Sequence, residues 1–183
     1  TTHDGAGIYA NWDDNILSLV NCTVGGNTSN ADDKYALYWE GDDNTLTIVN
    51  TIIWNPGLSS IYMDTDGGWD DQVINVAGSV IQGGIAGGIS TDDAVNVDQN
   101  ISGMVTGQDP AFVNTSGGDY SIANSSGAIS VGVDQVTFSS TTFTAPATDL
   151  AGNTRPNPVN TLLDAGAYEN INGIAAYSGD TWY

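Results

Sequence analysis

The sequence has almost no basic side chains. Lys34 and Arg155 are its only lysine and arginine, against 22 acidic residues, and the formal net charge is −20. Nucleic-acid binding needs basic groups that displace phosphate counterions, so we expect no nucleic-acid partner. An anionic membrane surface should repel the chain for the same reason. No apolar run approaches the roughly 20 residues that a membrane span needs, so we expect none.

Cysteine and the helix-forming charged residues are also scarce. Cys22 is the only cysteine, which excludes an internal disulfide, and it lies in a β-like run where a small buried hydrophobic residue is expected. Glu40 and Glu169 are the only glutamates, so nearly all the acids are aspartate. Asp, Asn and Gly favour turns and disfavour helix interiors. The composition therefore predicts an all-β chain with many turns.

Three segments repeat along the first half of the chain: residues 15–27, 44–56 and 72–84. Leu17 aligns with Leu46 and Ile74, and the next inward positions follow in the same way, at nearly equal intervals. Apolar and polar residues alternate within each segment, which is the period of a β-strand. Short strands at one long fixed period are typical of a β-solenoid, in which stacked turns share one interior. A β-sandwich is the alternative, although it does not require matched residues at a fixed period.

Several motifs resemble those of secreted bacterial right-handed parallel β-helix repeat proteins. The motifs are Gly5-Ala-Gly-Ile-Tyr9, Asp109-Pro-Ala-Phe-Val113, Gly118-Asp-Tyr-Ser-Ile122 and Asp164-Ala-Gly-Ala-Tyr-Glu169. The resemblance implies a right-handed parallel β-helix with an irregular β-rich C-terminal region and an extended tail. It also implies an extracellular or cell-surface location. The expected organisation is β-helix turns over residues 1–108, a terminal region of the same domain over 109–169, and a tail over 170–183.

The two ends of the chain suggest a first hypothesis for function. The first turn carries no recognisable cap, and the tail is rich in apolar and aromatic residues; the predicted contact residues are Ile171, Tyr177, Trp182 and Tyr183. Solenoid ends present unpaired strand edges, and a head-to-tail contact between copies can propagate into a fibre. We therefore expect a non-enzymatic extracellular structural or surface module, whose partners are copies of itself or other extracellular proteins.

The second hypothesis is a carbohydrate-active or glycan-binding β-helix. A polysaccharide lyase needs a base and cationic support, whereas this chain offers only Lys34, Arg155 and His3, far apart in sequence. Arg155 is expected to pair with Asp164 or Glu169 in a structural role. Glycosidases use two carboxylates across a cleft. The adjacent aspartate pairs lie in predicted turns, where solvated turn acids are the plainer interpretation, so no catalytic residue is assigned. Trp54 or Trp69 could line a sugar-binding groove.

One turn has the composition of a calcium loop. Residues 64–71 begin with aspartates at alternating positions, Asp64 and Asp66, followed by glycine, and end with Asp70 and Asp71. Ca²⁺ takes six to eight oxygen ligands, several of which these four aspartates could supply. The bidentate glutamate that ends an EF-hand loop is missing, so a plain acidic turn remains the alternative. These four residues are the candidate metal ligands, and Ca²⁺ is the only cofactor considered.

Five Asn-x-Ser/Thr sequons occur. Asn27, Asn100, Asn114 and Asn124 lie in predicted loops and are candidate glycosylation sites, while Asn21 lies in a repeat and is expected to join an inward asparagine ladder. Unmodified asparagines are the alternative, because an Asn- and Thr-rich chain contains sequons by chance.

Overall fold

The chain folds into a parallel β-helix of about three turns followed by an irregular region that contains two hairpins. The computed structural model describes residues 5–30, 34–64, 72–91 and 97–174. The β-helix contains β1 (Gly5–Asn11), β2 (Ile16–Val20), β3 (Thr23–Gly25), β4 (Tyr35–Glu40), β5 (Thr45–Val49), β6 (Ile52–Trp54), β7 (Ser59–Asp64), β8 (Gln72–Ile81), α1 (Gly84–Gly88), β9 (Ile89–Thr91) and β10 (Val97–Thr106). The C-terminal region contains β11 (Phe112–Asn114), the 3-10 turn η1 (Thr115–Gly117), β12 (Asp119–Ile122), β13 (Gln135–Phe138) and β14 (Thr141–Thr144).

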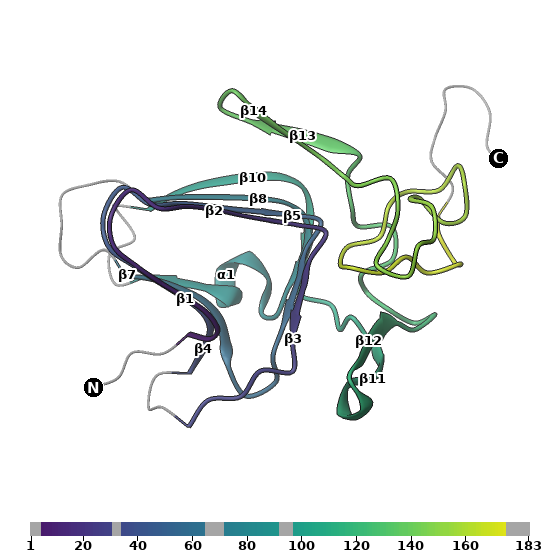
Figure 1. Ribbon diagram of the computed structural model, residues 1–183, viewed down its shortest axis with the longest axis horizontal. Helices are drawn as coiled ribbons and strands as arrows, with labels where there is room; N and C mark the ends of the chain where they lie inside the picture. The colour runs from purple at the N-terminus through teal and green to yellow at the C-terminus, as the bar shows by residue number, and fades with distance from the viewer. Residues whose placement is uncertain (1–4, 31–33, 65–71, 92–96, 175–183) are drawn as a thin grey trace.

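Each turn of the helix contributes strands to three sides of a roughly triangular outline (Figure 1). One side is the parallel sheet β1-β4-β7-β9, and a second is formed by β2, β5, β8 and β10. The third side is formed by β3, β6 and the end of β8, which is long enough to serve two sides. The C-terminal region lies beside the corner between the second and third sides (Figure 1).

The observed register confirms the repeats found in the sequence. Leu17 pairs with Leu46, and Leu46 pairs with Ile74, as the alignment of the three segments predicted. The structure adds one strand that the repeats did not predict, β10, which pairs in parallel with β8. Its Gln99 lies opposite Ile74 and is exposed, and it follows Ile74 at a shorter interval than the repeats keep. The repeats did not predict β10 because it is the edge strand of the stack, where the positions that align with buried residues of β8 need not be apolar.

The corner between the second and third sides is built from residues with left-handed backbone conformation. Asn21, Asn50, Gly78 and Gly103 occupy equivalent positions, with φ values of 50°, 49°, 56° and 67°. Glycine has no Cβ to clash in this conformation, and asparagine tolerates it better than most residues. The sequence therefore uses only these two residue types where the chain must turn.

Gly78 is the corner residue with the least room for a side chain. A Cβ there would lie 2.4 Å from Asn50 Oδ1, whereas the nearest atom to a Cβ at Gly103 is Val133 Cγ1 at 3.2 Å. We expect Gly78→Ala to lower the free energy of unfolding by about 2 kcal/mol, through left-handed strain and this contact. Gly103→Asn should lower it by less than about 1 kcal/mol, because asparagine tolerates the left-handed conformation. Urea denaturation measures both; similar costs for the two variants would contradict this account of the corner.

Two hydrophobic clusters hold the fold together. The interior cluster fills the triangle, and its fully buried members include Leu37, Trp39, Leu46, Ile48, Ile61 and Ile74. Ile85 of α1 packs against it. A second cluster joins the outside of the third side, through Ile52 and Val80, to Ile122, Ala128, Val131 and Ala165 of the C-terminal region. The C-terminal region is therefore packed onto the β-helix.

Candidate functional site: the tyrosine–carboxylate face

The outward face of the first side carries a stack of tyrosines. Strand residues alternate between the two faces of a sheet, so Leu37 and Trp39 point into the interior while Tyr38 between them points outward. Tyr9 pairs with Tyr38, and Tyr38 pairs with Tyr62, on three neighbouring parallel strands. Parallel in-register pairing therefore places three tyrosine rings one above another.

The rings are in contact. The centroids of Tyr38 and Tyr62 are 5.2 Å apart in a stacked arrangement, and those of Tyr9 and Tyr38 are 5.8 Å apart. Tyr35, at the start of β4, adds a fourth ring 4.6 Å from Tyr62. Such aromatic pairs contribute about 0.5–1.5 kcal/mol each beyond the area they bury. The stack is therefore a stable platform.

A ladder of polar side chains runs beside the rings, two residues further along each strand. Asn11 pairs with Glu40, and Glu40 pairs with Asp64. The Tyr9 hydroxyl donates to Glu40 Oε2 at 2.8 Å, and Asn11 Nδ2 donates to the same oxygen at 3.1 Å. The Tyr38 hydroxyl donates to Asp64 Oδ2 at 2.5 Å. We call Tyr9, Asn11, Tyr38, Glu40, Tyr62 and Asp64 the tyrosine–carboxylate face.

The electrostatics of the face keep its buried hydroxyl protonated. Burial raises the pKa of Tyr38 well above its ordinary value, and the hydrogen bond to Asp64 and the nearby carboxylates raise it further. Tyr38 is only 1% exposed, whereas the Tyr9 ring at the edge of the stack is 46% exposed. The buried ring therefore fixes the stack, and the exposed one is accessible to a ligand.

This combination of groups suits a polyhydroxylated ligand. Tyrosine rings offer an apolar surface with a polar tip. The carboxylates of Glu40 and Asp64 retain acceptor capacity, because an ionised carboxylate offers about four lone-pair positions. Binding sites of this kind combine apolar walls with a few placed polar groups that fix orientation. The face can therefore accept hydroxyl donors while stacking on the apolar side of a sugar ring.

The calcium prediction is not tested by the described part of the chain. Asp64 is described and accepts the hydrogen bond from Tyr38, whereas Asp66, Asp70 and Asp71 lie outside the described residues. Among residues 5–30, 34–64, 72–91 and 97–174, no three His, Cys, Asp or Glu side chains are grouped so that they could hold a metal ion. Calcium binding at the four aspartates stays a prediction.

The predicted glycosylation sites differ in their surroundings. Asn100, Asn114 and Asn124 are exposed, but the prediction of a loop is wrong for Asn100, which lies inside β10, and for Asn114, the last residue of β11. Asn100 Nδ2 donates to Asn75 Oδ1 at 3.0 Å. Asn27 is half-buried, and its Nδ2 donates to Asn55 Oδ1 at 3.1 Å. Asn21 is buried at the corner, where Asn50 Nδ2 donates to its Oδ1. The contact between the two asparagines is present, but the prediction that they point inward is wrong, because the Asn50 side chain bonds the Val133 backbone of the C-terminal region. Modification of the other four sites stays a prediction.

The remaining predicted residues fall in three places. Ile171 is 69% exposed, while Tyr177, Trp182, Tyr183 and also Trp69 lie outside the described residues. Trp54 packs against the second hydrophobic cluster. Arg155 forms the expected structural ion pair, and of its two predicted partners Glu169 is the one bound. Cys22 is a half-buried free thiol.

Sequence reasoning missed the tyrosine–carboxylate face, although a signal was present. An apolar residue, a tyrosine, any residue and then Asn, Glu or Asp recur at residues 8–11, 37–40 and 61–64. The second interval is shorter than the first, so it breaks the period of the neighbouring repeats. Only the structure shows that the three motifs pair in register.

No helix in the described ranges is long and apolar enough to cross a membrane. Comparison with protein-family models, with curated proteins and with solved structures found no match to the chain.

Proposed function

We propose that the protein is an extracellular, non-enzymatic β-helix module that binds neutral polysaccharides through the tyrosine–carboxylate face. The observation that carries the proposal is the in-register stack of Tyr9, Tyr38 and Tyr62 with the carboxylates of Glu40 and Asp64 beside it. A ligand would reach the face at Tyr9, which is 46% exposed at the edge of the stack, while buried Tyr38 holds that edge in place. The extracellular location comes from the sequence resemblance and is part of the proposal.

Charge favours a neutral ligand over an acidic one. The chain carries a net charge of −20, and the face itself presents two carboxylates and no base. An anionic polysaccharide would meet repulsion from both. Neutral sugar hydroxyls, by contrast, donate hydrogen bonds to Glu40 and Asp64.

Binding is favoured over cleavage because a candidate carboxylate and one of the two strong bases already have partners. Glu40 Oε2 already accepts two hydrogen bonds, from Tyr9 and Asn11. Arg155, one of the two strong bases, is ion-paired with Glu169 in the C-terminal region. A polysaccharide-cleaving enzyme is the alternative function, with Glu40 and Asp64 as its carboxylate pair.

Replacing Tyr9 with alanine tests the proposal. We expect Tyr9→Ala to weaken binding of a neutral polysaccharide about tenfold, because it removes the exposed ring and the hydroxyl that orients Glu40. Tyr9→Phe keeps the ring and should lose less. The measurement is a glycan array followed by isothermal titration calorimetry with the oligosaccharides that bind.

Val159→Ala is the matched control, since Val159 is an apolar residue of the C-terminal region that is 69% exposed. It should leave binding unchanged. Glycan binding that is equal in wild type, Tyr9→Ala and Val159→Ala would place the site elsewhere. Release of reducing ends or unsaturated products that disappears in Glu40→Gln and Asp64→Asn would show an enzyme instead.

Assembly into a head-to-tail fibre is a separate prediction. The strands of the first turn, β1, β2 and β3, pair on one side only among the described residues. Three of the four residues predicted to make the contact lie outside the described ranges. Fibre formation therefore stays a prediction that does not depend on the tyrosine–carboxylate face.

A further inference from the structure

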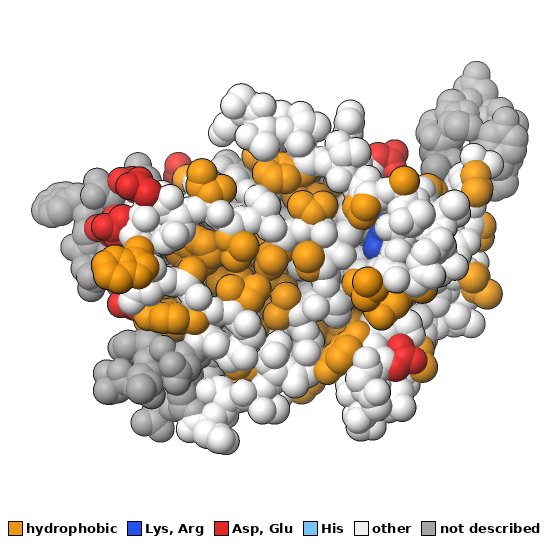
Figure 2. Space-filling model, in the orientation of Figure 1, with side chains coloured by type: hydrophobic (Ala, Val, Ile, Leu, Met, Phe, Trp, Pro, Cys, Tyr) orange, Lys and Arg blue, Asp and Glu red, His pale blue; other side chains and the backbone are white. Residues whose placement is uncertain are grey.

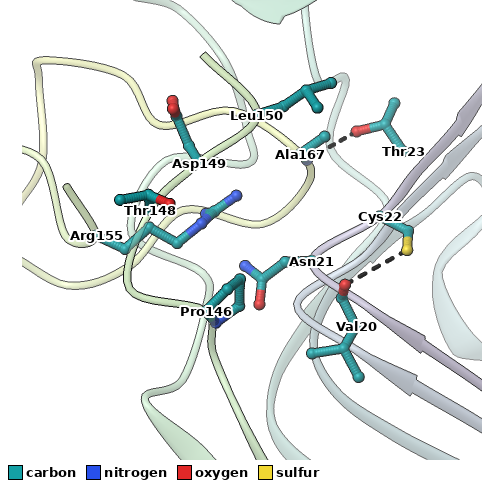
Figure 3. Close-up of a pocket in the computed structure, with 10 residues that line it drawn as sticks. All are labelled: Val20, Asn21, Cys22, Thr23, Pro146, Thr148, Asp149, Leu150, Arg155 and Ala167. Carbon is teal, nitrogen blue, oxygen red and sulfur yellow. Dashed lines mark hydrogen bonds between the residues drawn. The ribbon is translucent and has the colours of Figure 1, made fainter. Parts of the chain in front are cut away.

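A hollow of about 480 Å³ lies between the corner of the first turn and the C-terminal region. Residues 20–23 form one wall, and Pro146, Thr148, Leu150 and Ala167 belong to the other (Figure 3). In the space-filling view, a small basic patch is recessed between the two parts (Figure 2). Arg155 is the base that lines this hollow.

Two donors of the hollow have no acceptor among the described residues. Arg155 uses its terminal nitrogens, since Nη1 donates to Glu169 and Nη2 donates to the Gly166 carbonyl at 2.8 Å. Within the described part of the chain, its Nε has no partner, and neither has Nδ2 of Asn21, which is 7% exposed. The two side chains extend toward one another from opposite walls, with no hydrogen bond drawn between them (Figure 3).

A buried donor without an acceptor destabilises the folded protein, because it has lost its hydrogen bond to water. An oxygen acceptor that enters between Asn21 and Arg155 would satisfy both. The new hydrogen bonds would favour binding of the ligand, because both donors are already positioned and shielded from water.

The next turn of the helix shows which acceptor fits an asparagine at this corner. Asn50 occupies the position equivalent to Asn21. Its Nδ2 donates to the Val133 carbonyl at 2.7 Å, and its Oδ1 accepts from the Val133 N–H at 2.8 Å. The corner asparagine of the second turn thus holds a peptide segment by its backbone.

Charge favours a neutral acceptor over a carboxylate. The Arg155 cation is already paired with Glu169, and Asp149 also lines the hollow. Burial acts to raise the pKa of Asp149, but hydrogen bonds from the backbone N–H of Glu169 and from Asn153 outweigh it and lower the pKa, so this carboxylate is ionised at neutral pH. A peptide carbonyl carries no net charge and meets no repulsion.

We propose that this hollow binds an extended peptide segment by its backbone, with Asn21 Nδ2 and Arg155 Nε donating to one peptide carbonyl. The partner is a protein segment without acidic side chains near the contacting residue. Pro146 and Leu150 give the hollow apolar walls for small or apolar side chains of that segment.

Peptides selected against the intact protein test this site. A phage-displayed library of short linear peptides is panned on wild type and counter-selected on Asn21→Gly, and the enriched peptides are synthesised and titrated by fluorescence polarisation. Glycine is the residue of the later turns at this corner, so the variant removes the amide and keeps the backbone conformation. We expect Asn21→Gly to weaken binding at least tenfold. Replacing one peptide bond by an ester should identify the contacting unit.

Tyr9→Ala should leave peptide affinity unchanged, so failure of glycan binding and failure of peptide binding are distinguishable. An array that includes N-acetylated amino sugars, which carry an equivalent amide, covers the competing class. If no enriched peptide depends on Asn21, or if only the amino sugars do, the proposal is wrong.

Discussion

Replacing Arg155 with methionine is expected to lower the free energy of unfolding by about 3–5 kcal/mol, the largest single effect that this structure suggests. The Arg155 side chain is 2% exposed and its partner Glu169 is 0% exposed. Methionine fills a similar volume but leaves the Glu169 carboxylate buried without its counterion. Glu169 would keep only the backbone N–H groups of Asn157 and Asp164 as donors.

Urea denaturation at constant ionic strength measures the effect. Lys34→Met is the matched control, because it removes one positive charge from an exposed position and changes the net charge equally. It should cost less than about 1 kcal/mol. Adding Glu169→Gln to Arg155→Met should recover part of the loss, since no uncompensated charge remains. Equal costs for the two single variants would mean that global charge, and not the buried pair, is responsible.

The β-helix itself was predictable because the same pattern of apolar residues recurs in each turn. Matched apolar residues such as Leu17, Leu46 and Ile74 must lie in one interior, and their nearly constant spacing determines which strands pair. The ion-pair partner of Arg155 was predicted as one of two residues, Asp164 or Glu169, for a different reason. A chain with two strong bases offers few ways to form a structural ion pair.

The candidate sites were harder to predict because each depends on register between segments of unequal spacing. Tyr62 follows Tyr38 at a shorter interval than Tyr38 follows Tyr9, so the period of the repeats does not align all three. The hollow at Asn21 combines distant parts of the chain, and the sequence contains no signal that joins Asn21 to Arg155. The aspartate turns were recognisable in the sequence because their residues are contiguous. The sites that the structure shows combine residues that are far apart in the sequence.

The protein is also expected to become more stable as the pH falls from 7 to about 4.5. Burial raises the pKa of Asp164 to about 6, and the nearby Glu169 carboxylate adds to this, although N–H groups of Ser130 and Asn170 and the charge of Arg155 oppose it. Burial also raises the pKa of Glu169. Between about pH 4 and pH 6 the folded state therefore binds more protons than the unfolded state, and the stabilisation is lost as the pH rises through that interval. For Asp164 alone, a shift of about two pKa units corresponds to about 3 kcal/mol.

Asp164→Asn isolates this contribution, because asparagine cannot titrate. The net charge of −20 also weakens on acidification in every variant and relieves repulsion, so the quantity to compare is the difference between the pH profiles. Asp119→Asn removes one carboxylate from an exposed hairpin, where hydrogen bonds from Ser121 lower the pKa of Asp119, so its own contribution falls below pH 4. Its profile should run parallel to wild type from pH 7 to 4.5, while that of Asp164→Asn should rise by about 2 kcal/mol less, because the full stabilisation is reached only below the unfolded-state pKa. Parallel profiles for wild type and Asp164→Asn would show that Asp164 is ionised in the folded protein throughout this range. Asp164, Glu169 and Arg155 would then form a charged cluster in the C-terminal region. Replacing Arg155, the only strong base of that region, would then destabilise the protein more than replacing Asp164.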